Sequence, residues 1–305
     1  MEIKMALVVE FGNGGASTLS SLVDATQAAL AAQVGALQDG DVSEASDTIG
    51  SSILTQSVAV GAVGSAGSGT GGTVKIEFDP SANAYDFDVT SAWNSVKNVK
   101  AVSDDSENVT FSNFVHVDVI LGGVEASTVN IMDAKRGNVV TGQGNDTVNL
   151  TTLTNDAGWS NAFTINTNGG DDNIVIGAGN TGVAGAGVTN GSLTTFTINS
   201  GTGVDTIDLS AISAKASFVT GGKGADLMMA SGGVDTFVFA VGDTGTKLST
   251  ADVITGFGVN DKLDLYGVAA NWTAVDQGGG EFIVTNLLDN AKIIVEGDLS
   301  GSWFI

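Results

Sequence analysis

Glycine and aspartate recur in this chain at a spacing that could build a site for a hard cation. The run Thr220–Met228 contains the calcium-binding nonapeptide pattern G-G-x-G-x-D-x-U-x. Four partial copies keep parts of the same frame, and each places an apolar residue two positions after an aspartate: Asp146, Asp172, Asp205 and Asp235. One such string would be weak evidence, because Gly and Asp are common in loops, but five are hard to obtain by chance.

The residue types in this pattern fit calcium chemistry. Glycine adopts backbone dihedrals that other residues avoid, which lets carbonyl oxygens turn toward one point. Calcium binds six to eight oxygens from carboxylates, carbonyls and water. A Gly-Asp turn without metal is the alternative interpretation of every copy. The predicted calcium ligands and turn glycines are Gly142, Gly144 and Asp146; Asn168, Gly170, Asp171 and Asp172; Gly201, Gly203 and Asp205; Gly222, Gly224 and Asp226; Gly233 and Asp235.

A longer internal repeat determines how these turns should be arranged. Similar strand-like strings are centred on Val109, Val129, Val148, Ile174, Ile207 and Met228, at spacings of 20, 19, 26, 33 and 21 residues. A second strand-like string precedes most of the glycine turns. This pattern predicts a right-handed parallel β-solenoid of the β-roll or β-helix type. Asp146, Asp172, Asp205 and Asp226 are then expected on one edge of successive coils, and Asp235 on the opposite edge.

The rest of the chain divides into three predicted regions. Residues 1–72 are expected to form an N-terminal assembly region, with one amphipathic helix over 17–38 and a low-complexity stretch over 61–72. Residues 73–240 are expected to form the solenoid, with calcium-binding turns from about residue 140, and residues 241–305 a C-terminal β cap. The alternating run Val74–Phe78 predicts a strand that could pair with a neighbouring molecule.

Composition excludes several classes of partner. Acidic residues number 34 against 11 Lys plus Arg, giving a net charge of −23, so nucleic acid and anionic membranes would be repelled. Hydrophobic residues make up 42% of the chain, which is enough for a core. Cysteine is absent, so neither disulfides nor thiolate sites can form. No apolar segment is long enough to span a bilayer, and the first residues lack the features of a cleaved signal.

The glycine-aspartate turns and the C-terminal segment together resemble the repeats-in-toxin (RTX) family of secreted calcium-binding proteins. The resemblance covers roughly residues 140–305 and includes Asp235-Thr236-Phe237-Val238-Phe239, Ala251-Asp252-Val253-Ile254-Thr255-Gly256-Phe257 and Asn260-Asp261-Lys262-Leu263-Asp264-Leu265. It implies type I export guided by an uncleaved C-terminal signal, an extracellular or cell-surface location, and folding triggered by external calcium. The repeats here are fewer and more widely spaced than in a dense RTX array.

The sequence favours a structural role over catalysis. His116 is the only histidine, which excludes an H-E-x-x-H zinc site, and it is predicted to point outward from a strand. No G-x-S-x-G elbow is present. We therefore expect a calcium-dependent homo-oligomer or polymer that forms a surface layer or matrix filament. A monomeric adhesin that binds cell-surface polysaccharide, and a polysaccharide-acting enzyme, are the alternatives.

Overall fold

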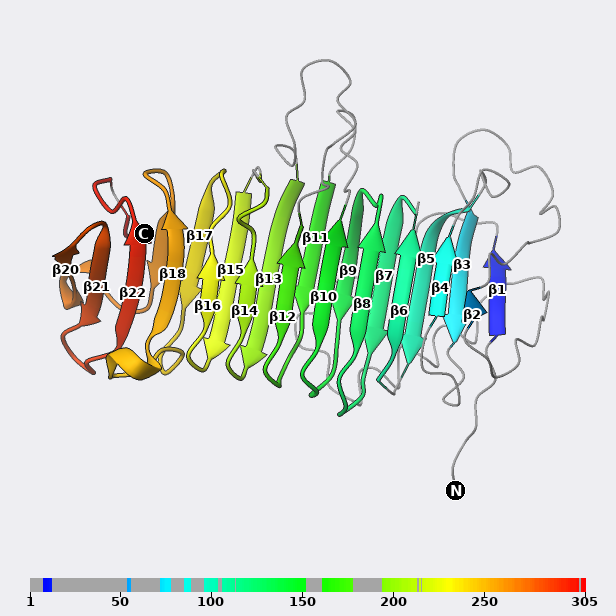
Figure 1. Cartoon of the computed structure of the whole chain (residues 1–305), viewed down its shortest axis with the longest axis horizontal. Coiled ribbons are helices and arrows are strands. Elements are labelled where there is room, and N and C mark those ends of the chain that lie inside the picture. The colour runs from blue at the N-terminus through cyan, green and yellow to red at the C-terminus, as the bar shows by residue number, and fades with distance from the viewer. Residues whose placement is uncertain are drawn as a thin grey trace, which may run out of the picture.

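The structure is a computed structural model in which two β-sheets run along the length of the molecule (Figure 1). It describes residues 8–12, 54–55, 72–77, 85–88, 96–103, 106–112, 114–151, 161–177, 194–212, 214, 216–301 and 303–305. Strands alternate between a first sheet of 10 strands and a second sheet of 12 strands. Parallel strands that alternate between two sheets are consistent with a solenoid-like fold, as the repeat predicted.

The first sheet contains the strands with odd numbers up to β19. Their bounds are β1 (Val8–Gly12), β3 (Gly72–Glu77), β5 (Val96–Ser103), β7 (His116–Leu121), β9 (Arg136–Val140), β11 (Asn161–Asn166), β13 (Thr194–Thr202), β15 (Ala216–Lys223), β17 (Asp235–Phe239) and β19 (Lys262–Leu265).

The second sheet contains the strands with even numbers and β21. Their bounds are β2 (Leu54–Thr55), β4 (Tyr85–Asp88), β6 (Asn108–Ser112), β8 (Thr128–Met132), β10 (Thr147–Thr151), β12 (Asn173–Ile176), β14 (Thr206–Asp208), β16 (Leu227–Met229), β18 (Asp252–Phe257), β20 (Trp272–Gly278), β21 (Glu281–Asn286) and β22 (Lys292–Gly297). Two short 3-10 helices, Leu248–Thr250 and Ala269–Asn271, interrupt the C-terminal part.

The core lies between the sheets, because each strand turns alternate apolar side chains inward. In the second sheet, the six residues that define the sequence repeat pair one to one across successive parallel strands. In the first sheet, Val119, Val139, Ile165, Ile198 and Val219 form the matching inner row. These side chains belong to one buried cluster, so each coil buries its inner face only by stacking on its neighbours.

Parallel pairing continues beyond residue 240, where the solenoid was predicted to end. β17 pairs with β19 and β18 pairs with β22, both in parallel. Only then does the chain change to an antiparallel meander of β20, β21 and β22. The C-terminal region thus adds a further coil before it closes the second sheet.

The strand predicted over 74–78 exists as β3, but it is not free to join another molecule. It pairs antiparallel with β1 on one side and parallel with β5 on the other. A strand with two neighbours has no unpaired backbone edge. That part of the assembly prediction is therefore wrong.

Two predicted features lie outside the described residues: the helix over 17–38 and the low-complexity stretch over 61–71. The described part of the chain contains no α-helix. Accordingly, none of its helical segments approaches the length and apolarity needed to cross a bilayer.

Candidate metal centre

Five aspartates form a column along one edge of the second sheet. Each of them either directly precedes a strand of that sheet or, in β18, begins it. We call this set the aspartate column: Asp146, Asp172, Asp205, Asp226 and Asp252. Parallel register of β10, β12, β14, β16 and β18 places its members on consecutive coils. The column thus contains the four aspartates that the repeat predicted to share an edge, and one more.

Each carboxylate in the column is tied to the preceding coil by its Oδ1 atom. The backbone N–H of Ser127 donates to Asp146 at 2.7 Å, and each aspartate N–H then donates to the next aspartate at 2.7 to 2.9 Å. At the C-terminal end, the N–H of Asp252 donates to the Thr244 hydroxyl at 3.0 Å. The column therefore links each pair of adjacent coils through one hydrogen bond from a backbone N–H group to a carboxylate.

The second carboxylate oxygen of every column member is buried without a hydrogen-bond donor. All five residues are at most 2% exposed, and the Oδ2 atom of each has no partner. Hydroxyls at Thr141, Thr167 and Ser200 lie close enough to lower the pKa of the nearest column member. Each hydroxyl nevertheless donates to a carbonyl of the next coil. Orphaned buried oxygens are rare in folded proteins and indicate a missing partner.

Burial raises the pKa of every member of the column. Loss of solvation raises the pKa of Asp172 to about 8, that of Asp226 to about 7 and that of Asp252 to about 8. Repulsion from neighbouring carboxylates adds to this effect. The pKa values of Asp146 and Asp205 are raised for the same main reason. Among the described residues, no Lys, Arg or His contributes to these pKa values, so no protein cation compensates the column.

The turn glycines stack so closely that no side chain fits between successive turns. A Cβ added at Gly203 would lie 1.8 Å from the Gly170 carbonyl oxygen, and one added at Gly224 would lie 1.5 Å from that of Gly203. The backbone N–H groups of Gly170 and Gly203 donate to Thr202 and Lys223 of the next coil at 2.9 Å. The glycines thus allow the backbones of adjacent coils to approach closely. The carbonyl groups of several turns point toward the next coil.

Substituting alanine at Gly203 is expected to destabilise the fold by about 3 kcal/mol or more, because the new methyl group overlaps a backbone carbonyl. Gly279 is the matched control, since its φ of 71° is also positive but nothing lies within 4 Å of the added Cβ. Gly279→Ala is expected to cost only about 1 kcal/mol. Thermal unfolding in one buffer compares the two variants. Equal melting temperatures would show that the turns are not in contact.

Asp171, which was also predicted as a ligand, lies on the outside of its turn. It is exposed, and its Oδ1 accepts the Val204 N–H at 2.8 Å. Its own N–H donates to Asn145 Oδ1 at 2.9 Å. Asp171 and Asn145 thus form an outer series of contacts, which runs in the opposite direction to the aspartate column and remains in water.

Asp235 does not join the column, because it begins β17 in the first sheet. Both of its carboxylate oxygens accept hydrogen bonds from Ser231, one from the backbone N–H at 2.7 Å and one from the hydroxyl at 3.1 Å. Its N–H donates to Asp261, whose other oxygen accepts the Gly258 N–H at 2.7 Å. This edge therefore satisfies its carboxylates with protein donors, and Gly233 packs against the Ala214 carbonyl.

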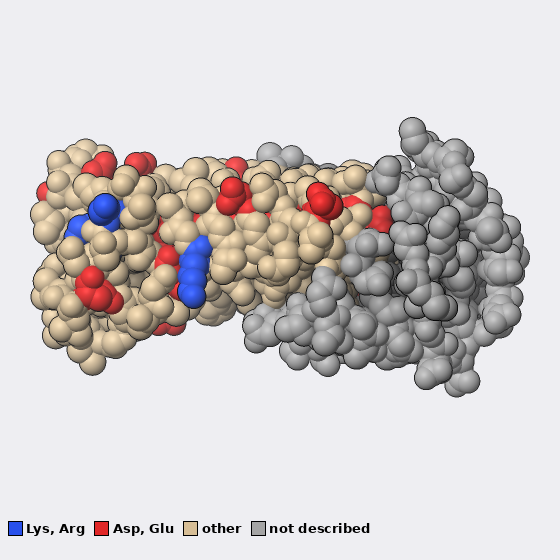
Figure 2. Space-filling model, turned by 90° about the horizontal axis from the view of Figure 1, so that it is seen from below, with Lys and Arg blue, Asp and Glu red and all other residues tan. Residues whose placement is uncertain are grey.

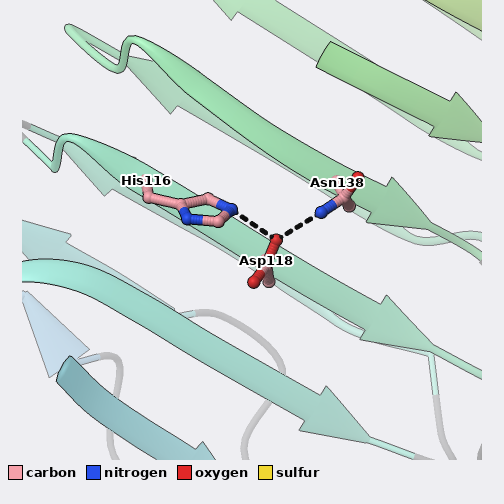
Figure 3. Close-up of polar contacts among 3 residues, drawn as sticks. All are labelled: His116, Asp118 and Asn138. Atoms are coloured by element: carbon pink, nitrogen blue, oxygen red, sulfur yellow. Dashed lines mark hydrogen bonds and ion pairs between the residues drawn. The ribbon is translucent and has the colours of Figure 1, made fainter. Parts of the chain in front are cut away.

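The only histidine belongs to a separate buried cluster on β7 and β9 (Figure 3). His116 Nε2 lies 2.8 Å from Asp118 Oδ1, which also accepts the Asn138 side-chain N–H at 2.7 Å. His116 lies on the outward face, opposite the core residues Val117 and Val119. His116 is buried there nevertheless, because β7 is buried on both faces.

Asp252 and Asp261 were not among the predicted ligands, although each has the Asp-x-apolar spacing of the other copies. Ile254 and Leu263 stand two places after them and face the core. The glycine two places before the aspartate, which the other five turns share, is missing before both aspartates. Their spacing from Asp226 and Asp235 is 26 residues in each case, and this shared spacing is the signal that could have found them.

The donor set of the aspartate column fits calcium. Its five unpartnered oxygens are hard anionic ligands. In the described part of the chain, no group of three or more His, Cys, Asp or Glu side chains converges on one point. A cation here would therefore need carbonyl or water ligands in addition to carboxylates from neighbouring coils.

Comparison of the chain with protein-family models, curated proteins and solved structures found no significant match. The interpretation of the aspartate column therefore rests on its own geometry.

Proposed function

We propose that this chain is a secreted calcium-binding structural protein, a right-handed parallel β-solenoid of the RTX type that assembles with copies of itself. The observation that supports this proposal is the row of five buried carboxylates whose Oδ2 atoms have no donor. Right-handed crossovers are by far the commoner connection between parallel strands. The proposed product of assembly is a cell-surface layer or a matrix filament.

Calcium would be held by Asp146, Asp172, Asp205, Asp226 and Asp252, with turn carbonyls and water completing its shell. When bound, the cation supplies positive charge where burial and mutual repulsion now disfavour ionisation. The protein contributes the spacing, because the Oδ1 contacts hold each carboxylate against the next coil. Calcium binding and coil stacking are then the same event.

The charge distribution supports folding after export. The chain carries a net charge of −23, and acidic side chains are spread along the face drawn in Figure 2, whereas Lys and Arg appear only toward its C-terminal end. Where calcium is scarce, such a chain repels itself and stays open enough to pass a secretion channel. Millimolar calcium outside the cell would then drive folding by mass action.

The burial of the single histidine and its contact with an aspartate favour a structural role over catalysis. His116 Nε2 is engaged by Asp118 in a buried cluster, which leaves this nitrogen poorly placed to act as a general base on a substrate. The aspartate column is equally buried, which favours an ion over a polymer chain as its ligand.

Electron microscopy of the purified full chain tests the proposal. With millimolar calcium we expect ordered layers or filaments, and after excess EGTA their loss. Titration calorimetry on the same sample is expected to show calcium uptake. Calcium uptake by a chain that stays monomeric would favour the adhesin alternative, and turnover of a polysaccharide panel would favour the enzyme. Absence of uptake would overturn the proposal as a whole.

A further inference from the structure

The two sheets end differently at the C-terminal end of the molecule. In the first sheet, the last residues of the chain cover the edge of β19: Leu263 N–H donates to Trp303 O at 2.6 Å and Ile305 N–H donates to Leu263 O at 3.2 Å. Trp303 and Phe304 also pack on the core. In the second sheet, β20 is the terminal strand and pairs only with β21. One edge is closed and the other is open.

The open edge has little of the usual protection against pairing, because its irregularity is confined to a register shift between Asp276 and Gly278 at the end of the strand. Six of the seven residues of β20 are exposed, and the strand contains no Lys, Arg or Pro and a single charge, Asp276. Natural edge strands are commonly blocked by lysine, proline, a bulge or extreme shortness. Before this register shift, the edge from Trp272 to Asp276 has none of these features and presents unpaired backbone groups that another strand can satisfy.

Exposed apolar side chains lie next to the same edge. Val275, at the centre of β20, is 55% exposed, and Val268, Leu287 and Leu288 near the start of the strand are 60%, 62% and 77% exposed. The loops that carry them are joined, since Leu287 N–H donates to Asn271 O at 2.7 Å and Asn271 N–H to Val268 O at 2.9 Å. Several large apolar side chains exposed beside an open strand edge are typical of an interaction surface.

We propose that the outer edge of β20 pairs antiparallel with β20 of a second copy of this chain. The inference rests on the self-assembly stated above, and it names the contact. Pairing centred on Val275 sets Ala274 opposite Asp276, so that no two aspartates face each other directly. The two Val275 side chains meet at the twofold axis, which is a favourable cross-strand pair.

This geometry sets the form of the contact. A strand that pairs with the same strand of a second copy makes an isologous, closed interface. Two molecules therefore join at their C-terminal ends, and the sheet formed by β22, β21 and β20 continues into the same three strands of the second copy. Growth beyond this dimer must use other surfaces. Pairing of β20 with β1 of a second copy would instead be heterologous and would extend without limit.

The absence of cysteine makes crosslinking at the axis a direct test. Val275→Cys in the full chain, oxidised at millimolar calcium, is expected to yield a covalent dimer, because directly opposed residues in an antiparallel pair bring their Cβ atoms about 5 Å apart. Val124→Cys, at a turn residue near β8 that is even more exposed than Val275, is the control and is expected not to crosslink. Val275→Lys is expected to weaken dimerisation at least tenfold in sedimentation velocity.

The outcomes separate this inference from the proposed function. If wild-type protein assembles while Val275→Lys assembles equally well and Val275→Cys does not crosslink, the β20 contact is wrong and self-assembly stands. If the wild-type chain binds calcium but stays monomeric, both self-assembly and this contact fail. Circular dichroism of Val275→Lys, with an unchanged melting temperature, shows that a loss of dimer is not a loss of fold.

Discussion

In excess EGTA, the chain is expected to be about 5 kcal/mol less stable at about pH 9 than at about pH 5. The pKa values of Asp172 and Asp252 are raised to about 8, and that of Asp226 to about 7, from 3.8. A group whose pKa is higher in the folded state favours folding below its unfolded pKa. That contribution is lost as the pH rises through the folded pKa. Without metal, stability therefore falls from about pH 4 to about pH 8.

The size of this effect decides whether the fold survives. About pH 5 lies roughly three pH units below the pKa values of Asp172 and Asp252 and roughly two below that of Asp226, and each unit is worth about 1.4 kcal/mol. The total is roughly 11 kcal/mol, and halving it for the water that reaches these turns leaves about 5 kcal/mol. Whole domains are stable by only about 5 to 15 kcal/mol, so ionising the column without a cation removes a large part of that stability.

Calcium is expected to abolish this pH dependence, because the ionised column is then the form that binds. Far-UV circular dichroism during thermal unfolding, at both pH values with EGTA or with millimolar calcium, provides the measurement. Magnesium is the control for general ionic screening, since it prefers a smaller octahedral site. Melting temperatures that coincide at the two pH values in EGTA would mean that the column is not buried as the structure has it.

The repeat could be predicted from the sequence because it depends on local signals. An apolar residue two places after an aspartate fixes the inward face of the next strand. Val148, Ile174, Ile207 and Met228 accordingly pair one to one. The glycine frame marked the turns, although it did not reveal that the glycines are needed mainly because carbonyls of adjacent turns approach them.

The features that could not be predicted from the sequence depend on contacts between residues that are far apart in the chain. Asp235 has the same local pattern as the column members, yet Ser231 satisfies both of its oxygens. His116 alternates like an outward residue but is covered, because burial of the outer face of β7 is a tertiary property. Asp252 lacked the glycine turn, and its membership of the column follows only from the 26-residue contact with Asp226.

Adjacent aspartates give the sharpest test of which carboxylates bind the ion, since Asp171 is exposed and Asp172 is buried. Asp172→Asn keeps an oxygen for the Asp146 N–H but cannot ionise. In EGTA at about pH 9, we expect it to raise stability by up to about 2 kcal/mol. Removing a buried charge gains roughly 3 kcal/mol after screening, while the new buried amide N–H costs about 1 to 3 kcal/mol if left unpaired.

With calcium, the same substitution is expected to lower stability instead of raising it. Loss of one carboxylate removes an anionic ligand from the ions beside Asp146 and Asp205, so calcium affinity should fall at least tenfold, which corresponds to about 1.4 kcal/mol. Asp171→Asn, which can still accept the Val204 N–H, is expected to change neither quantity. Titration calorimetry and thermal unfolding of both variants, with and without calcium, provide the measurements.

If Asp172→Asn raises stability in EGTA and lowers it in calcium, Asp172 is a ligand of the ion and not only a structural aspartate. If Asp172 served only to accept the Asp146 N–H, Asn would substitute for it equally well with and without calcium, and the two melting curves would shift together. If Asp171 were the ligand, the loss of calcium affinity would instead follow Asp171→Asn. Only a buried carboxylate whose charge is unfavourable alone and favourable beside a cation gives stabilisation in EGTA and destabilisation in calcium from one substitution.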